Sequence, residues 1–350
     1  MALKNIIVDA RKFSSSRGAF LALLEHVRLL KSSGFKVHLL VDETTKRLAV
    51  DERVDDCEFI IIDTLFGIYV EIFLSILKFD RVSIFCPHAV SFGWHLPFLP
   101  FVNIFYWVQG LVSDEMETRS ERRFRILIMR LLERLSYKRA NFCIVVSNAM
   151  KKELENRYGP RKNIHIIPCL PRLTPKVAPK IPHSFCYIGG MSPWQKVDQA
   201  LEFFNKYIEL HPSATFKIAT NDIKSAQSKI DRYASKIAKR SIAVLSLDTK
   251  EEVSDFLSDT QFGFLLRDDL PLNRVASPIK FGEYLSCGVS VIISPKVGDY
   301  SDLVCRYDAG FIWSSGGSID GLRYNNQGVQ NLYQDFFNDD KFKIIYKHDC

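Results

Sequence analysis

The most informative stretch of this sequence reads Arg274-Val-Ala-Ser-Pro-Ile-Lys-Phe-Gly-Glu-Tyr-Leu-Ser-Cys-Gly-Val-Ser-Val-Ile-Ile293. Ser277 is suited to cap a helix at its N-terminus, and Pro278 is suited to be the first helical residue. Gly288 is suited to end that helix directly before an apolar run of strand length. The stretch therefore predicts a loop, a short helix and a buried strand in direct succession, as in α/β proteins.

This helix carries two opposite charges, Lys280 and Glu283, which are three positions apart and so share one face near its N-terminus. The N–H groups at a helix N-terminus favour an anion, and an ammonium beside them strengthens a site for a diphosphate. Glu283 can accept hydrogen bonds from a ribose diol at the same place. The alternative is a capped amphipathic helix in which the two residues form only an i,i+3 ion pair.

Apolar runs that alternate with helical patterns extend outward from this stretch. In the first half of the chain they predict strands at Asn5–Asp9, Lys36–Val41, Glu58–Asp63, Val82–Cys86, Asn103–Gln109 and Phe142–Ser147. In the second half they predict strands at Ser184–Ile188, Thr215–Thr220, Ile242–Leu247, Phe262–Leu266, Val289–Ser294 and Gly310–Trp313. Helical patterns lie at Gly18–Ser32, Ser120–Lys138, Gln195–Leu210, Ile223–Lys239, Lys250–Leu257 and Pro278–Ser286. Continuous apolar strands joined by helices predict parallel sheets covered on both faces.

A proline-rich segment separates the two series, since five of the 14 prolines fall within Pro168–Pro182. Proline lacks an amide donor and disfavours helix, so this segment is predicted to be an extended linker. The sequence thus predicts an α/β protein of two Rossmann-like domains with parallel sheets facing each other across a cleft. The expected parts are an N-terminal domain at 1–167, a linker at 168–182, a C-terminal domain at 183–325, and a C-terminal helical segment at 326–350 that can cross back to the first domain.

The composition narrows the class of protein. The 350 residues are 47% hydrophobic and 25% charged, which is typical of a globular protein. The formal net charge is +7, and residues 1–170 hold 25 basic against 19 acidic side chains. An excess this small does not require a nucleic-acid partner. The eight cysteines form no C-x-x-C pair, which favours buried, reduced thiols. There is no apolar run of bilayer length and no signal-peptide pattern, so we expect a cytoplasmic protein.

Several common catalytic motifs are absent from the sequence. No G-x-G-x-x-G follows the first predicted strand, and no G-x-x-x-x-G-K-[ST], G-x-S-x-G or H-E-x-x-H occurs. These absences disfavour dinucleotide dehydrogenases, P-loop NTPases, α/β hydrolases and zincins.

Three segments, in order along the chain, resemble family-four-like glycosyltransferases of the GT-B fold that take part in capsule and O-antigen assembly. Ser277-Pro-Ile-Lys-Phe-Gly-Glu-Tyr-Leu-Ser-Cys-Gly288 resembles the donor-binding motif of these enzymes. Ala140-Asn-Phe-Cys-Ile-Val-Val-Ser-Asn-Ala-Met150 is similar to the segment that ends their N-terminal domain. Phe185-Cys-Tyr-Ile-Gly-Gly-Met-Ser-Pro-Trp-Gln-Lys-Val-Asp198 is similar to the segment that opens their nucleotide-binding domain.

The resemblance implies a nucleotide-sugar site in the C-terminal domain, with Glu283 on the ribose and positive charge on the diphosphate. Where the family often has an arginine and a lysine in the glycine loop, this chain has Gly190 and Gln195, and Val275 replaces one of two paired glutamates. The positive charge must then come from elsewhere. The candidate donor-site residues are Gly189, Gly190, Trp194, Gln195, Arg267, Arg274, Ser277, Lys280 and Glu283. The paired glycines would let the backbone approach phosphate oxygens.

Acceptor candidates lie where strands of the first domain end. The loop Arg11–Gly18 follows the first predicted strand and offers Ser14, Ser15, Ser16 and Arg17. His88, Asp114 or Glu115 could act as a general base toward an acceptor hydroxyl if the reaction inverts. For each single residue the alternative is a solvated polar group on a loop.

The segment Arg119–Arg139 combines many basic side chains with apolar ones in helical spacing. Basic amphipathic helices bind anionic membrane surfaces, where polyprenyl-diphosphate acceptors reside. The alternative is a core-packed helix with a solvated basic face.

Taken with the resemblance, these patterns predict a glycosyltransferase that moves a sugar from a nucleotide sugar to an oligosaccharide or polyprenyl-diphosphate-linked acceptor of a bacterial surface polysaccharide. We expect no metal and no cofactor besides the nucleotide sugar, and a place at the inner face of the cell membrane. Two alternatives are a GT-B sugar-nucleotide epimerase and a catalytically silent GT-B scaffold subunit.

Overall fold

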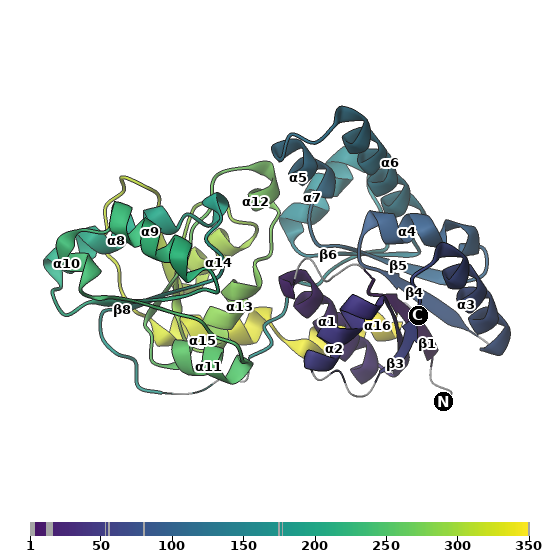
Figure 1. Ribbon diagram of the computed structural model, residues 1–350, viewed down its shortest axis with the longest axis horizontal. Coiled ribbons are helices and arrows are strands. Elements are labelled where there is room, and N and C mark those ends of the chain that lie inside the picture. The colour runs from purple at the N-terminus through teal and green to yellow at the C-terminus, as the bar shows by residue number, and fades with distance from the viewer. Residues whose placement is uncertain are drawn as a thin grey trace. The chain divides into compact units, whose positions relative to one another are not determined.

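The computed structural model describes residues 4–11, 17–52, 54, 57–79, 81–173, 176 and 178–348 (Figure 1). Two compact units make up the chain. The first unit extends to Cys169 and takes in the C-terminal residues from Asp339 onward. The second unit runs from Leu170 to Asn338, so the proline-rich segment predicted at 168–182 lies where the second unit begins.

A seven-stranded sheet with the order β3-β2-β1-β4-β5-β6-β7 forms the centre of the first unit, and all of its pairings are parallel. Its strands are β1 (Lys4–Asp9), β2 (Phe35–Val41), β3 (Glu58–Ile61), β4 (Val82–Cys86), β5 (Asn103–Val108), β6 (Phe142–Val145) and β7 (Ile164–Ile166). The helices around it are α1 (Arg17–Ser32), α2 (Glu43–Asp51), α3 (Leu65–Lys78), α4 (Ala89–His95), α5 (Val112–Thr118), α6 (Arg123–Arg139), α7 (Asn148–Tyr158) and α16 (Asp339–His348), with a 3-10 turn at Leu96–Phe98.

The second unit repeats this plan with a six-stranded parallel sheet of order β10-β9-β8-β11-β12-β13. Its strands are β8 (Ser184–Ile188), β9 (Thr215–Ala219), β10 (Ile242–Leu245), β11 (Phe262–Leu265), β12 (Ser290–Ile293) and β13 (Gly310–Ile312). Its helices are α8 (Val197–Leu210), α9 (Ile223–Tyr233), α10 (Lys236–Lys239), α11 (Lys250–Ser258), α12 (Pro271–Arg274), α13 (Ile279–Ser286), α14 (Tyr300–Tyr307) and α15 (Asn326–Phe336), with a 3-10 turn at Pro193–Gln195. In both sheets the strand order reverses beside the first strand, and ligands of open α/β sheets bind at the carboxyl ends of strands at such points.

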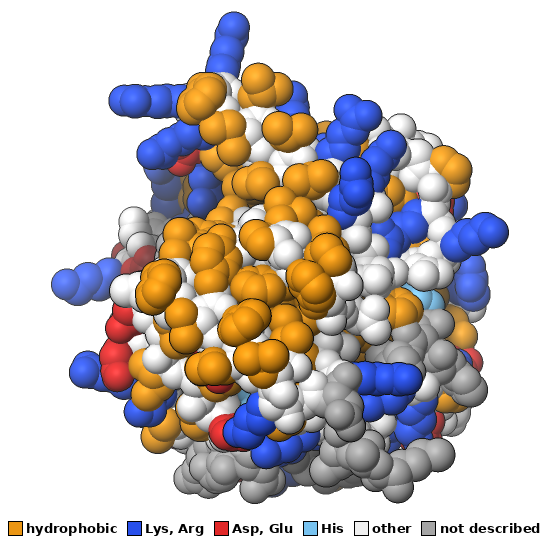
Figure 2. All heavy atoms as spheres, turned by 90° about the vertical axis from the view of Figure 1, so that its right-hand side faces the viewer, with side chains coloured by type: hydrophobic (Ala, Val, Ile, Leu, Met, Phe, Trp, Pro, Cys, Tyr) orange, Lys and Arg blue, Asp and Glu red, His pale blue; other side chains and the backbone are white. Residues whose placement is uncertain are grey.

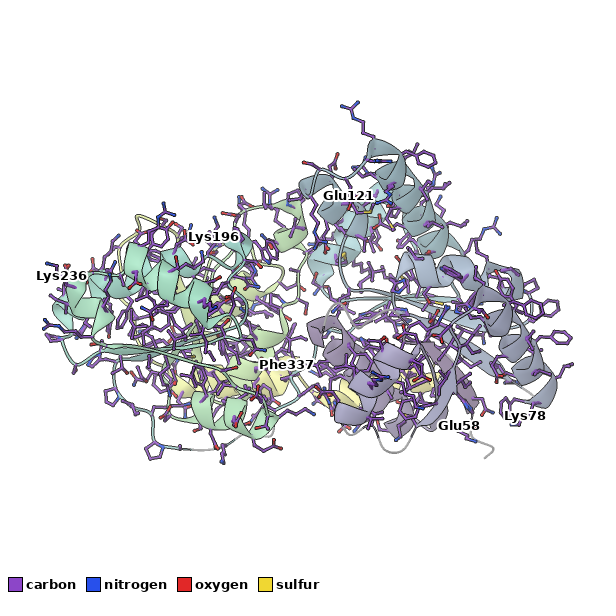
Figure 3. All side chains as sticks on the ribbon, in the orientation of Figure 1. Glu58, Lys78, Glu121, Lys196, Lys236 and Phe337 are labelled. Carbon is purple, nitrogen blue, oxygen red and sulfur yellow. The ribbon has the colours of Figure 1, made fainter. Side chains whose placement is uncertain are left out.

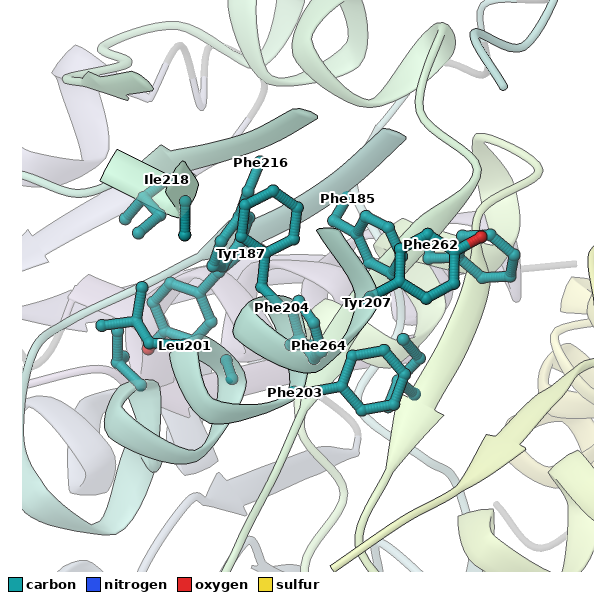
Figure 4. Packing of buried hydrophobic residues seen from close by; sticks show 14 of the residues in the cluster. Phe185, Tyr187, Leu201, Phe203, Phe204, Tyr207, Phe216, Ile218, Phe262 and Phe264 are labelled. Carbon is teal, nitrogen blue, oxygen red and sulfur yellow. The ribbon is translucent and has the colours of Figure 1, made fainter. Parts of the chain in front are cut away.

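The core of the second unit is rich in aromatic side chains, which pack between the sheet and α8 (Figure 4). Phe185 lies at its centre, with its ring centroid 5.2 Å from that of Phe262 and 5.7 Å from that of Phe264. Because α8 buries Phe203, Phe204 and Tyr207 on one face against these strands, it holds the loop before it at the edge of the sheet.

Helix α16 belongs to the first unit, where its Tyr346 packs beside α1. The Tyr346 hydroxyl lies 2.6 Å from Nδ1 of His26, and both side chains are buried. Burial lowers the pKa of His26 to about 3, so the ring is neutral at physiological pH.

Tyr346→Phe is expected to lower the free energy of unfolding of the first unit by about 1–3 kcal/mol, because it leaves a buried ring nitrogen without its partner. Denaturant unfolding followed by circular dichroism would measure the change. Tyr307→Phe, which removes an exposed hydrogen bond to Asp335, is the matched control and should shift stability by about 0.5 kcal/mol or less. Equal changes in the free energy of unfolding for the two variants would contradict a role of Tyr346 in holding α16 beside α1.

Some sequence predictions need correction. The helix predicted at Ile223–Lys239 is two helices, because Ala234 is extended and the Ser235 side chain caps the second one. Ser277 does not cap α13, whose N-cap is Pro278 with no side-chain hydrogen bond. Strand β7 was not predicted, and neither were the helices α2, α3, α4, α5, α7, α12 and α14.

Among the described residues, six cysteines are buried outside any disulfide, and Cys305 is exposed. Within the described part of the chain, no helix combines the length and the apolar character needed to cross a membrane.

Candidate functional site

The loop that follows β8 brings the two predicted glycines to the carboxyl edge of the second sheet. Gly189 has φ +138°, and a Cβ atom there would lie 3.0 Å from Nζ of Lys280. Gly190 has open space where a side chain would be, and its carbonyl accepts a hydrogen bond of 2.6 Å from the Tyr187 hydroxyl. The positive φ therefore favours glycine at position 189, and a side chain there would also have to displace the ammonium of Lys280.

Lys280, in the first turn of α13, points back to this loop rather than along its own helix. Its Nζ donates to Oε1 of Gln195 at 2.9 Å and lies 4.4 Å from the centroid of the Tyr187 ring. Among the described residues it forms no ion pair with Glu283, so the i,i+3 pair that was the alternative prediction is absent. Burial lowers the pKa of Lys280 well below its usual value, and the charge of Arg267 lowers it further.

A second half-buried cation, Arg267, follows β11 beside Lys280. Its guanidinium donates to the carbonyl oxygen of Leu266 at 2.9 Å, and no carboxylate of the described chain pairs with it. Burial lowers its pKa from the usual value. Lys280 and Arg267 are thus two neighbouring cations that form no ion pair with a described carboxylate. They lie beside the N-terminus of α13 and the loop that holds Gly189 and Gly190. Because burying an unpaired charge is costly, this arrangement favours an anionic ligand.

Glu283 lies one turn further along α13. Burial raises its pKa to about 7, although the positive charges of Lys280 and Arg172 lower it. Within the described residues, no hydrogen-bond donor reaches its carboxylate. A half-buried acceptor of this kind is suited to the hydroxyls of a ligand, as predicted for a ribose.

The raised pKa of Glu283 predicts how stability depends on pH. Its folded-state pKa of about 7 lies above the usual 4.5, so the folded protein holds a proton that the unfolded chain releases. Between these two values the stability that Glu283 contributes is expected to fall as pH rises, and to level off above about pH 7. Thermal unfolding of the wild type and of Glu283→Gln across this range would test it, and a constant difference between the two melting temperatures would contradict it.

A pocket of about 450 Å³ opens beside the glycine loop, at the carboxyl ends of β8, β9 and β10. It is lined by Ile188, Gly189, Gly190, Ala219, Thr220, Asn221, Asp222, Leu247 and Val253. The Asp222 carboxylate accepts from the amide of Ser225 at 3.1 Å and so caps α9. A mixed polar and apolar pocket next to the cation pair is of a size to hold a planar base.

The other predicted donor-site residues differ in their burial and in their partners. Arg274 is exposed, and its Nε contacts Asp269 at 2.5 Å. The buried hydroxyl of Ser277 lies 2.5 Å from that of Tyr300. Trp194 is 48% exposed in the 3-10 turn of the loop, so its ring is available to a ligand. Of the predicted set, the structure thus brings together Gly189, Gln195, Arg267, Lys280 and Glu283.

In the first unit, a pocket of about 400 Å³ lies at the carboxyl ends of β4 and β5 and includes His88 and Glu115. Nδ1 of His88 accepts a hydrogen bond of 2.9 Å from the amide of Ser91 and caps α4. This contact places the proton of the neutral ring on Nε2, a donor rather than a base. Burial raises the pKa of Glu115.

Asp114, also predicted as a base, forms two hydrogen bonds to the guanidinium of Arg157 at 2.6 and 2.8 Å. Both of its carboxylate oxygens are thus engaged by the arginine, and Asp114 does not line the pocket. Among the predicted bases, Glu115 is therefore the one that the pocket favours. The serines at positions 14–16 and the side chain of Arg17 lie outside the described residues.

A buried polar cluster at the end of β1 was not predicted. Asp9 accepts hydrogen bonds from Arg11 at 2.7 and 2.8 Å, from the Ser91 hydroxyl at 2.7 Å, and contacts Nε2 of His95 at 3.0 Å. Burial alone would raise the pKa of Asp9, but the hydrogen bonds of His95 and Arg11 hold it well below its usual range. Nothing in the sequence pattern pairs these residues, because His95 lies in an apolar stretch.

Comparisons with known proteins agree with the two-unit architecture. Residues 17–170 match the model of Glycosyltransferase Family 4. No curated protein sequence matches the chain significantly. Sucrose-phosphate synthase from Thermosynechococcus elongatus is similar with a TM-score of 0.74 and 12% identity, over 97% of this chain and 96% of that chain.

Two further solved structures are similar over nearly their full length. HepE from Anabaena, solved in complex with UDP, has a TM-score of 0.67 and 12% identity over 98% of each chain. A glycosyltransferase from Rickettsia africae has a TM-score of 0.66 and 12% identity, over 100% of this chain and 99% of that chain. These likenesses confirm the predicted GT-B fold.

Proposed function

We propose that this chain is a glycosyltransferase that transfers a sugar from a nucleotide sugar to a growing bacterial surface polysaccharide or its lipid-linked precursor. The GT-B fold and the match of residues 17–170 to the model of Glycosyltransferase Family 4 support this proposal. The observation that supports this most is the cation pair of Lys280 and Arg267, which has no carboxylate partner in the described chain and lies beside the glycine loop.

In this proposal the diphosphate of the donor binds between the glycine loop and the N-terminus of α13. Lys280 and Arg267 contact its oxygens. The negative charge of the diphosphate raises the pKa values of both side chains, which burial lowers in the free protein. Glu283 accepts hydrogen bonds from the ribose, and the base occupies the pocket at the ends of β8 and β9. Anabaena HepE was solved with UDP and with UDP-glucose, so a uridine nucleotide is the first candidate.

Catalysis then consists of positioning and electrostatic stabilisation. Negative charge develops on the departing diphosphate, and preformed donors directed at it lower the barrier. The ammonium of Lys280, the guanidinium of Arg267 and the helix N-terminus are such donors. Because these groups already supply positive charge, we propose that the chain needs no cofactor besides the nucleotide sugar.

The acceptor is proposed to bind the first unit at the pocket that includes His88 and Glu115. Burial raises the pKa of Glu115, so Glu115 is a stronger base than an exposed glutamate. Such a base suits proton removal from an acceptor hydroxyl if the reaction inverts the configuration of the transferred sugar.

The donor can be tested with a thermal-shift panel of UDP, GDP, CMP and dTDP. A nucleotide that binds the folded protein stabilises it by RT ln(1 + [L]/Kd), or about 2.7 kcal/mol at a hundredfold excess over Kd. We expect one nucleoside diphosphate to raise the melting temperature of the protein more than the other nucleotides of the panel do. If none of them stabilised the protein, the proposed donor site would be wrong.

A further inference from the structure

Helix α3 exposes an apolar face along its whole length. Only Ile68, Ile72 and Ser75 of its fourteen residues are buried. Its exposed large side chains are Leu65, Phe66, Tyr69, Val70, Phe73, Leu74 and Leu77, with Phe66 77% and Leu77 68% exposed. Because these positions recur at intervals of four residues, they form one broad stripe on the side opposite the buried residues.

Helix α6 adds a second apolar row on the same unit. Phe124, Leu127, Ile128 and Leu131 are exposed, and their spacing of three and four residues places them in line. By the same helical spacing, Arg123, Arg130 and Arg134 lie along one flank of this row. The opposite side of α6 is buried through Ile126, Glu133, Ser136 and Tyr137.

Hydrophobic side chains gather on one face of the protein, and lysine and arginine side chains project around them (Figure 2). The exposed Phe101, 70% accessible, follows the turn whose Phe98 packs on Tyr69 of α3. The side chains of α3, which ends at Lys78, extend outward from the unit (Figure 3). A contiguous patch of this extent is unusual on a soluble monomer and marks an interaction surface.

The charge beside this patch is strongly positive. The segment 119–139 holds eight basic residues and two acidic ones. Arg125 pairs with Glu121 at 3.3 Å and Arg130 with Glu117 at 2.7 Å, whereas the other basic residues form no ion pair with a described residue. Uncompensated positive charge around an apolar face complements an anionic lipid surface.

We propose that α3 and the apolar row of α6 insert into the interface of an anionic bilayer, with the arginines of α6 on the lipid headgroups. A second copy of this chain is the other possible occupant of the face. It is disfavoured because copies would bring the same unpaired arginines together, and like charges repel. The inference goes beyond the proposed function, since vesicle binding requires no sugar transfer.

Co-sedimentation with vesicles tests this surface. The wild type is expected to bind phosphatidylcholine vesicles that contain phosphatidylglycerol and to bind pure phosphatidylcholine far less. Raising the salt from about 0.1 M to about 1 M, which shortens the Debye length from about 10 Å to about 3 Å, should weaken this binding. Because apolar insertion remains, the binding should not vanish.

The variant Phe73→Asp/Leu77→Asp is expected to lower vesicle partitioning by about tenfold or more. Its matched control is Leu210→Asp/Ile237→Asp, which places the same charges at exposed apolar positions of the second unit. The control should bind like the wild type. Arg123→Gln/Arg134→Gln should lower binding to anionic vesicles by about fivefold for each arginine, since each headgroup contact is worth about that factor.

Circular dichroism and calorimetric UDP titration of each variant separate the outcomes. Lost vesicle binding with unchanged folding and UDP affinity supports the surface. Equal binding by the α3 variant and its control would overturn the proposal, and so would equal binding to both kinds of vesicle. If the molecular mass of the α3 variant in solution were half that of the wild type, the face would bind a second copy of the chain instead. Failure of every variant to bind UDP would count against the donor site and not against this surface.

Discussion

Lys280→Ala is expected to lower kcat about 100- to 1,000-fold, because it removes a preformed positive group from the place where the leaving diphosphate gains charge. Its Nζ donates to Gln195 and lies beside Gly189, so an alanine leaves the loop without its cation. The nucleoside part of the donor makes no contact with this ammonium in the proposed pose. Affinity for the nucleoside should therefore change little while turnover collapses.

Steady-state kinetics with the preferred nucleotide sugar, together with calorimetric titration of the matching nucleoside, would measure the two effects. Lys296→Ala is the matched control, because Lys296 is an exposed lysine of the same unit that pairs with Asp269 at 2.8 Å. Wild-type turnover in the Lys280 variant would show that the diphosphate lies elsewhere.

Glu283→Ala is expected to weaken binding of the preferred nucleotide by roughly 10- to 150-fold, since charge-assisted hydrogen bonds to a ribose are worth about 1.5–3 kcal/mol. The fold should be kept, because no hydrogen bond of the described chain depends on this carboxylate. Calorimetry at about pH 8 keeps the carboxylate ionised in the wild type, given its pKa of about 7.

Glu209→Ala, at an exposed position of α8, is the control for the loss of a glutamate. A folded Glu283→Ala protein with unchanged nucleotide affinity would mean that α13 is only an amphipathic helix. Comparison with the Lys280 variant then separates ribose recognition from stabilisation of the diphosphate.

The strands were the most predictable part of this protein. Val82–Cys86 and Ser184–Ile188 were predicted to the residue, because short apolar runs between helices have few other ways to be buried. Strand β7 has only three residues, too few for a recognisable pattern. Helix α3 is apolar on its exposed side as well as its buried one, so it lacks the polar face by which an amphipathic helix is recognised.

The candidate site was predictable in its residues but not in its contacts. The spacing of Lys280 and Glu283 indicated a charged helix face, but an ion pair between them and a nucleotide site were equally compatible with that spacing. In the structure α13 packs against a loop 85 positions earlier, and Lys280 donates to Gln195 and not to Glu283. The nucleotide site stays a prediction. Likewise, His95 and Asp9 are 86 positions apart along the chain, and only the tertiary structure brings their side chains into contact.

By itself, the amino-acid sequence determined the α/β class, the order of the strands except β7, and the segments that resemble donor-binding motifs. Those features follow from local periodicity and from residues that start or end an element within a few positions. Only the tertiary structure decided which charges are buried without a partner, that burial raises the pKa of Glu283, and that α3 has an exposed apolar face. Burial and pairing depend on which distant segments pack together, and neither property is encoded by neighbours along the chain.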